Sequence, residues 1–216
     1  MNQAAEINVT GLGKVSAMPD GIQIDLSVVS QKPDYPQTLA HLNGRVSAIV
    51  DAVARAGTNE SVITKSYAIS EVWSDQYDEE KRKFQGYKAS QKMAVTIPLD
   101  MVLLGCVAKE LAKSQSNPGM GITFVIRDMD ALVKGARIAA ATKAKEAAND
   151  LAEAAGLQLV SVKTITYKAE KKHGESELLH MNSLAQYDIS PAASITPDAI
   201  SHEETVHMVW LASSEN

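Results

Sequence analysis

The chain is poor in several residue types that mark specialised protein classes. It has one cysteine in 216 residues, so no intrachain disulfide can form. Aromatic residues make up 5% of the chain, with only two phenylalanines. Lys and Arg number 21 against 26 Asp and Glu, which gives a formal net charge of −5. These scarcities exclude disulfide-scaffold proteins and argue against a generic nucleic-acid binder, whose domain is usually basic.

Long hydrophobic runs are also lacking, and none approaches the roughly 20 residues that a membrane span requires. The opening residues carry neither the basic stretch nor the apolar core of a secretory signal. We therefore expect a cytoplasmic protein, with a periplasmic or envelope location as the alternative if an export signal has been removed. Cys106 lies in the apolar run 101–108, which predicts a buried thiol that packs as a small hydrophobic side chain.

Two hydrophobic periods divide the chain into expected elements. Alternation of apolar and polar residues indicates strands, and apolar stripes at three- and four-residue spacing indicate helices. The expected strands are 6–17, 22–28, 62–73, 84–97, 121–127, 159–167 and 205–211, and the expected helices are 34–57, 101–114 and 131–155. The first two strands flank turn residues at 18–21, so we expect them to pair as a hairpin.

The order ββαββ-α-β-α-ββ predicts an α+β fold, with mainly antiparallel sheet packed against three helices. We expect two closely packed halves of one domain, residues 1–82 and 83–216. Residues 168–200 are polar and show no sustained period. Because a long structureless segment is unusual inside a compact domain, this insert is expected to be a mobile loop, a lid or an arm that packs on a neighbour.

Small residues gather at two places. The helix expected at 131–155 contains eleven alanines, and its inner side is expected to allow close approach of another element. The residues expected on that side are Leu132, Ala136, Ala139, Ala140, Ala147 and Leu151. In the first strand, Gly11 and Gly13 are expected to bend or bulge the backbone.

Several local strings, in this order, resemble the SIMPL-domain family (DUF541). They cover nearly the whole chain: the Gly-x-Gly-x-Val strand and Pro-Asp turn within 7–20, Gly-Tyr-x-Ala-Ser at 86–90, the alanine-rich helix at 135–148, Leu-Ala-Glu-Ala-Ala-Gly at 151–156, and Val206 with Trp210 in the last strand. The resemblance implies an α+β fold, assembly into oligomers including rings, and no established catalytic activity. Envelope members of the family are linked to stress tolerance, and the family's name comes from a protein that binds a kinase.

No catalytic or ligand motif stands out. His202 and His207 are spaced one residue too far apart for the His-Glu-x-x-His zinc motif, and they lie in an expected strand, where positions five apart point to opposite faces. Gly11-Leu-Gly13-Lys14 lacks the spacing, the following Ser or Thr, and the helix of a phosphate-binding loop. We expect no cofactor, no bound metal and no enzymatic activity.

The sequence therefore predicts a non-enzymatic homo-oligomeric protein that makes no membrane span and binds no nucleic acid. The residues expected at subunit contacts are Trp73, Tyr77, Tyr187 and Ile189. Two alternatives stay open. One is a small-ligand module or enzyme with a site in the cleft between the halves. The other is a module that docks an unidentified protein partner, an idea that rests on family analogy alone.

Overall fold

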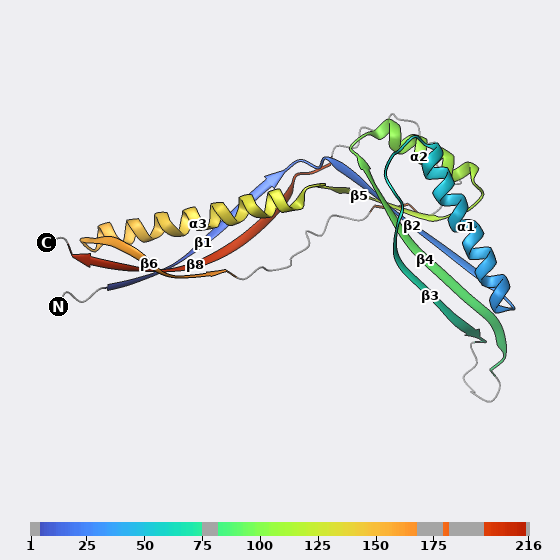
Figure 1. Cartoon of the computed structure of the whole chain (residues 1–216), viewed down its shortest axis with the longest axis horizontal. Helices are drawn as coiled ribbons and strands as arrows, with labels where there is room; N and C mark the ends of the chain where they lie inside the picture. The colour runs from blue at the N-terminus through green and yellow to red at the C-terminus, as the bar shows by residue number, and fades with distance from the viewer. Residues whose placement is uncertain (1–4, 75–81, 168–178, 182–196, 215–216) are drawn as a thin grey trace. The chain divides into compact units, whose positions relative to one another are not determined.

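The computed structural model describes residues 5–74, 82–167, 179–181 and 197–214, and it confirms the α+β fold (Figure 1). Helices and antiparallel strands occur in the expected order, with one additional three-residue strand, β7, inside the insert. The elements are β1 (Ala5–Ala17), β2 (Gly21–Lys32), α1 (Tyr35–Arg55), β3 (Ile63–Trp73), β4 (Phe84–Pro98), α2 (Met101–Lys113), β5 (Gly119–Val125), α3 (Met129–Ala154), β6 (Leu157–Tyr167), β7 (Leu179–Met181) and β8 (Ile200–Ser214).

The chain separates into two compact units. Unit 1 comprises Met1–Pro19, Ile126–Glu175 and Asp198–Asn216, and unit 2 comprises Asp20–Val125 and Ser176–Pro197. Residues 82 and 83, between which we expected the division into halves, both belong to unit 2. Unit 1 is thus assembled from both ends of the chain, with its central helix supplied from the middle.

The predicted hairpin between the first two strands is wrong. β1 pairs with β8 in a three-stranded antiparallel sheet of order β1-β8-β6, and β2 lies in a five-stranded sheet of order β3-β4-β2-β5-β7. The turn at Met18–Gly21 therefore carries the chain from one unit to the other. Turn residues and alternation are local signals, and they do not specify which strand a partner will be.

Unit 1 packs α3 along one face of the β1-β8-β6 sheet (Figure 1). The helix buries a stripe repeating every four residues, which consists of Leu132, Ala136, Ala140, Ala144, Ala148 and Ala152. This stripe corrects the predicted one at three places, because Leu151 is exposed and Ala139 and Ala147 are only partly buried. Val9, Val206 and Met208 complete the small core against these alanines.

Gly11 and Gly13 let α3 approach β1 closely. A Cβ atom added to Gly11 would lie 2.0 Å from the carbonyl oxygen of Ala140, and one added to Gly13 would lie 2.0 Å from that of Ala136. The pairing of β1 with β8 runs without a register shift through both glycines. The predicted bulge is therefore wrong, and the glycines are explained by helix–strand contact at two successive turns.

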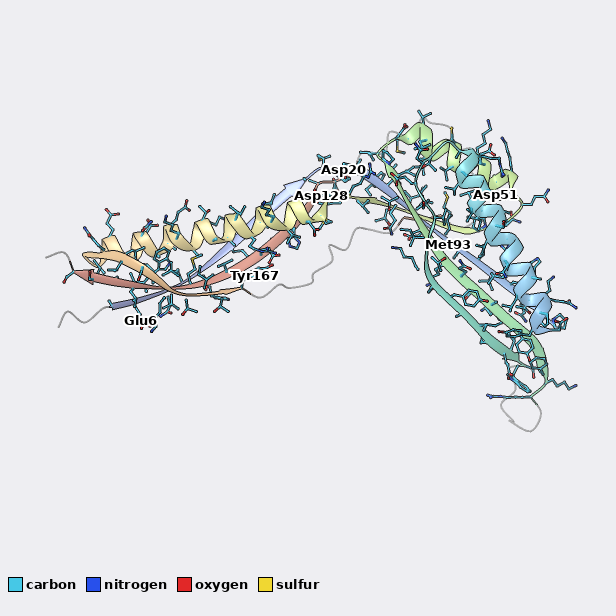
Figure 2. All side chains as sticks on the ribbon, viewed as in Figure 1. Glu6, Asp20, Asp51, Met93, Asp128 and Tyr167 are labelled. Atoms are coloured by element: carbon cyan, nitrogen blue, oxygen red, sulfur yellow. The ribbon has the colours of Figure 1, made fainter. Side chains whose placement is uncertain are left out.

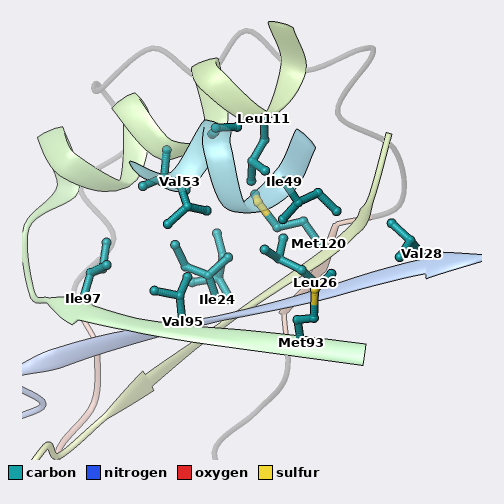
Figure 3. Packing of buried hydrophobic residues seen from close by; sticks show 14 of the residues in the cluster. Ile24, Leu26, Val28, Ile49, Val53, Met93, Val95, Ile97, Leu111 and Met120 are labelled. Atoms are coloured by element: carbon teal, nitrogen blue, oxygen red, sulfur yellow. The ribbon is translucent and has the colours of Figure 1, made fainter. Parts of the chain in front are cut away.

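Unit 2 packs α1 and α2 on one face of its sheet, and this layer holds the larger core (Figure 3). Alternate side chains of the two central strands, β2 and β4, meet the inner sides of both helices. The most deeply buried members are Ile22, Ile24, Leu26, Met93, Val95, Ile97, Leu42, Ile49, Val53, Val107 and Leu111. A continuous apolar layer of branched side chains therefore fixes the sheet register in this unit.

The helix starts follow the sequence prediction. Asp34 and Asp100 cap α1 and α2, and their carboxylates accept hydrogen bonds from backbone N–H groups of the first turn. The prediction for Cys106 is wrong, because the thiol is exposed. The buried stripe of α2 consists of Leu104, Val107, Ala108 and Leu111, and this spacing turns residue 106 outward.

Candidate functional site

One end of unit 2 exposes a row of aromatic side chains. Trp73 ends β3 and lies opposite Phe84, the first residue of β4. Their rings meet at 5.3 Å between centroids, Phe84 meets Tyr87 at 5.2 Å, and Tyr87 meets Tyr35 at 5.3 Å, all in edge-to-face geometry. We call these four residues the aromatic row. Trp73, Phe84 and Tyr35 expose 48%, 43% and 44% of their surface, far more than aromatic side chains that only stabilise a core.

Three local features position this row. Tyr35 begins α1 directly after the cap residue Asp34. Gly86 adopts a φ of +118°, and a Cβ there would lie 2.2 Å from the carbonyl oxygen of Lys32. A register shift next to Gly86 then places Phe84 opposite Trp73. Glycine at position 86 therefore allows the backbone geometry that brings the Trp73 and Phe84 rings into contact.

The strand that carries Trp73 is an edge strand. Among the described strands, β3 pairs with β4 alone and ends the five-stranded sheet. Nine of its eleven residues are exposed, and none is buried. Ile63 and Tyr67 add large apolar surface, at 58% and 49% exposed. An edge of this length, rich in aromatic and β-branched residues, presents backbone N–H and C=O groups to another strand.

A hollow of about 210 Å³ adjoins this edge on the helix-covered side of the sheet. It is lined by Tyr35, Ile69, Ser70, Glu71 and Tyr87. The Glu71 carboxylate accepts a hydrogen bond of 3.1 Å from the indole N–H of Trp73. The site thus combines an unpaired strand edge, a row of rings and one carboxylate, which are the components of a protein-contact surface.

Of the four residues predicted at subunit contacts, Trp73 lies in this site. Tyr77, Tyr187 and Ile189 lie outside the described residues. The three other members of the aromatic row were not among the predicted contact residues. Tyr87 and Phe84 stand in an expected strand and Tyr35 stands at a helix start, so only the strand register and the entry into α1 bring them to Trp73.

A second polar feature lies in unit 1, on the α3 side of the sheet. Arg137 Nη2 donates to the Tyr167 hydroxyl at 2.9 Å, and that hydroxyl donates to Glu204 Oε1 at 3.0 Å. The His202 Nε2 atom lies 3.1 Å from the same carboxylate oxygen. The Arg137 guanidinium also stacks 4.4 Å from the Tyr167 ring centroid. We call Arg137, Tyr167, Glu204 and His202 the polar chain; Figure 2 labels Tyr167 on β6.

The polar chain gives the histidine pair a structural explanation. His202 and Glu204 are buried, whereas His207 lies on the opposite face, where its Nδ1 is 2.8 Å from the Thr10 hydroxyl. The two histidines therefore face away from each other, as their spacing predicts. Within the described ranges, no group of three His, Cys, Asp or Glu side chains is arranged to hold a metal ion. The polar chain therefore links α3, β6 and β8 through side chains that hydrogen-bond to one another.

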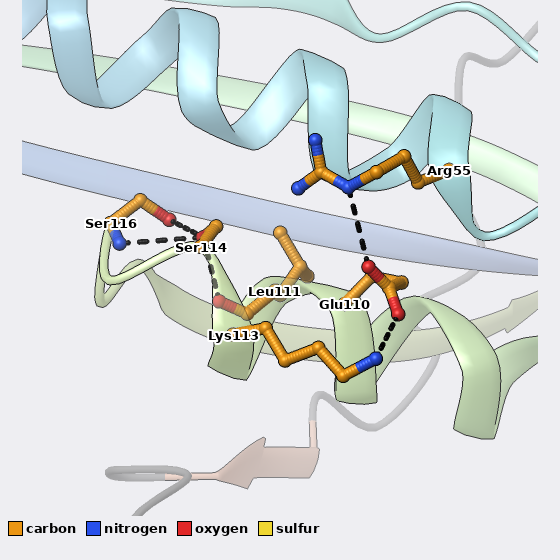
Figure 4. Close-up of polar contacts among 6 residues, drawn as sticks. All are labelled: Arg55, Glu110, Leu111, Lys113, Ser114 and Ser116. Atoms are coloured by element: carbon orange, nitrogen blue, oxygen red, sulfur yellow. Dashed lines mark hydrogen bonds and ion pairs between the residues drawn. The ribbon is translucent and has the colours of Figure 1, made fainter.

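Electrostatics in unit 2 centre on Glu110 of α2 (Figure 4). Its carboxylate lies 2.6 Å from Lys113 Nζ, one turn along the same helix, and 3.3 Å from Arg55 Nε at the end of α1. These two cations hold the pKa of Glu110 below its ordinary value, the Lys113 hydrogen bond being the largest cause, while partial burial opposes the shift. The group ties the C-terminal turns of two helices together and lies away from the aromatic row.

Residues 7–210 match the SIMPL family, described as a protein of unknown function (DUF541). Two curated relatives, each named "26 kDa periplasmic immunogenic protein", come from Brucella melitensis and Brucella abortus. Each is 27% identical over 168 residues, which cover 76% of this chain and 67% of the relative.

No helix in the described part of the chain is both long and apolar enough to cross a membrane. The family match extends from β1 to β8 and includes both units. The matched residues include Gly11 and Gly13, which contact α3, as well as Gly86 and most of the final strand, β8. The chain belongs to the SIMPL family.

Proposed function

We propose that this protein is a non-enzymatic, homo-oligomeric assembly protein whose subunits meet at the aromatic row and the β3 edge of unit 2. The observation that supports it most is the exposed Trp73 ring, held in place by Phe84 and by Glu71 while nearly half its surface faces solvent. Large, pre-positioned aromatic side chains carry much of the binding energy in protein interfaces, because they bury area with little loss of conformational freedom.

A contact with protein suits this surface better than a small ligand. The hollow beside β3 is bordered by the exposed edge of a strand, and most of the apolar area lies outside it, on Ile63, Tyr67 and Trp73. Small-molecule sites instead enclose most of the ligand surface among convergent polar groups. An extended, ridge-like surface with an unpaired backbone is suited to a second strand.

The names of the relatives bear on location. Both Brucella proteins are named as periplasmic. We therefore favour the cell envelope over the cytoplasm for the assembled protein. Osmotic-shock fractionation of cells that make the complete gene product tests this, and recovery of the protein solely with cytoplasmic markers would reverse the assignment.

The oligomer proposal is tested by light scattering coupled to size exclusion on the whole chain at micromolar concentration. We expect a mass that is a multiple of 23.2 kDa. Trp73→Ala should lower that mass toward the monomer, because it removes the largest exposed ring of the site. Ile138→Ala is the matched control, since Ile138 is 57% exposed but lies on α3 of unit 1. A monomeric unmodified chain, or equal effects of the two variants, would contradict the proposal.

A further inference from the structure

We infer that β3 pairs antiparallel with β3 of a second copy of this chain, about a two-fold axis that passes beside Ala68. This inference rests on the proposed homo-oligomer and specifies its contact. No strand in the described residues pairs with the outer edge of β3, and a strand added there continues the five-stranded sheet into a second copy. A closed two-fold contact uses the same surface patch on both copies, so one strand must be complementary to itself.

Symmetry restricts the possible registers. Residues directly opposite each other in antiparallel strands point to the same face of the sheet. A two-fold axis perpendicular to the sheet keeps each side chain on its own face. The two members of a pair must therefore be separated by an even number of residues, and one residue must lie opposite itself.

The sequence of β3 is complementary to itself when that residue is Ala68. Tyr67 then lies opposite Ile69 of the second copy, and Ser66 lies opposite Ser70. Each of these pairs occurs twice across the axis. An aromatic residue opposite a β-branched one, and two small hydroxyl side chains opposite each other, are favourable cross-strand pairs. The small Ala68 side chain leaves room for the second copy at the axis itself.

The same register pairs opposite charges. Lys65 is the extra residue where the pairing of β3 with β4 shifts, so it stands just beyond the regular run Ser66–Val72, where its long side chain can reach Glu71 of the second copy. Both residues are exposed. Glu71 already accepts one hydrogen bond from Trp73, and a carboxylate has further acceptor positions for a lysine. Two ion pairs therefore flank the paired segment symmetrically.

Neighbouring registers lack this combination. Moving the axis to Ile69 places Tyr67 opposite Glu71 and Lys65 opposite Trp73. Moving it to Ser70 places Ile69 opposite Glu71 and leaves Lys65 beyond the paired segment. Moving it to Glu71 brings two identical carboxylates together, which is unfavourable. Among these registers, only the one centred on Ala68 matches both the charges and the apolar side chains.

The hollow beside β3 gives independent support. Ile69 lines it together with Tyr35, Glu71 and Tyr87. In the register centred on Ala68, Tyr67 of the second copy lies directly opposite Ile69, on the face of the sheet where the hollow opens. Its phenol ring can cover the hollow and extend the aromatic row across the axis. The exposed tyrosine of the strand, Tyr67, thus meets the concave part of the same surface.

The edges of unit 1 are less suited to this pairing. β1 contributes one large exposed apolar side chain, Leu12, and its charges Glu6 and Lys14 already form ion pairs with Lys163 and Glu203. β6 exposes Val160, Val162 and Ile165, but its pairing with β8 shifts near residues 160 and 163 and leaves no more than four residues in unbroken register. The pairing of β3 with β4 also shifts twice, yet the run Ser66–Val72 between the shifts stays in register. A strand interrupted by bulges is less able to pair edge to edge, so the longer regular run favours β3 over β6.

Thiol cross-linking of the whole chain tests the register. In a Cys106→Ala background, Ala68→Cys places two thiols opposite each other across the axis, with Cβ atoms about 5 Å apart, and a short bifunctional thiol reagent should convert most of the protein into a covalent dimer. Ser66→Cys alone should not cross-link, because its two copies are about 13 Å apart along the strands. An equimolar mixture of Ser66→Cys and Ser70→Cys chains should cross-link again.

Charge reversal gives a second measurement. Lys65→Glu should weaken association about tenfold, because both ion pairs become repulsive. Combining it with Glu71→Lys should restore the dissociation constant of the unmodified chain. An oligomer that depends on Trp73 but shows no Ala68→Cys cross-link, or no rescue by the double reversal, would overturn the strand pairing alone. A monomeric chain would overturn both this inference and the proposed function, and efficient cross-linking through Thr10→Cys would assign the contact to β1 instead.

Discussion

At the residue scale, the packing of unit 1 is set by positions that carry no side chain. Gly11 and Gly13 sit beneath two successive turns of α3, and each would drive a Cβ atom into a backbone carbonyl of the helix. The alanines that face them keep the helix at this short distance. A larger side chain at either glycine forces the backbone of α3 or β1 to move, because no flexible side chain is available to give way.

We therefore expect Gly13→Ala to lower the free energy of unfolding by about 2–3 kcal/mol, the cost of overpacking a close contact. Urea unfolding followed by circular dichroism measures it. Gly44→Ala is the control, because nothing lies within 4 Å of a Cβ at that exposed position of α1. Helix propensity there should raise stability by about 0.5–1 kcal/mol. If both variants changed the free energy of unfolding in the same direction, the close contact between α3 and β1 would be contradicted.

Sequence alone could identify the small residues but not the reason for them. Alanine spacing on α3 indicated a tight contact, and two glycines in a strand indicated something other than side-chain packing. The structure joins these two signals, since each glycine meets one alanine turn. For Cys106 the sequence was misleading. Its neighbours are all apolar, so the helical spacing of the buried residues, which places Cys106 on the exposed side of α2, could not be recognised.

At the element scale, the helices of unit 2 are joined by Glu110. Because its folded-state pKa is lowered, this carboxylate contributes stability that is present above its ordinary pKa and is lost as the pH falls through the lowered value. Glu110→Gln should therefore be less stable than the unmodified chain near pH 7 and should approach it near pH 3, in urea unfolding at both values.

The partners of Glu110 sharpen this prediction. The Lys113 hydrogen bond is the larger cause of the lowered pKa, so Lys113→Gln should reproduce most of the effect and Arg55→Gln less of it. The lysine pair lies within α2, whereas the arginine pair joins α2 to α1. A stability difference that does not change between the two pH values would rule out this contribution.

The elements themselves were largely predictable, but their pairing was not. Periodicity predicted the helices and most strands to within a few residues, because it is a local signal. β1 pairs with β8, nearly two hundred residues away, and nothing local distinguishes that partner from the adjacent β2. The same limit applies to the candidate site. Trp73 could be selected from the sequence, but its contacts with the rest of the aromatic row depend on the strand register, which the sequence does not specify.

At the scale of the whole molecule, the central claim is that the β3 edge is buried between copies of the chain. In unit 1 the alanine-lined helix covers the sheet, and the buried His202 and Glu204 side chains are hydrogen-bonded within the polar chain. Unit 2 has a large core, and its longer edge strand in the described residues is β3, where the aromatic row ends. In the proposed assembly, the cores of both units provide the stability of the fold, and β3 provides the contact between copies.

Hydrogen–deuterium exchange, read by mass spectrometry at several protein concentrations, tests this claim most directly. The peptide that covers β3, Ile63–Trp73, should exchange more slowly as concentration rises, because its outward N–H groups become hydrogen-bonded to a second strand. The peptide that covers β6, Leu157–Tyr167, provides the internal control and should show no such dependence. Exchange of β3 that stays constant while the measured mass increases would contradict the account.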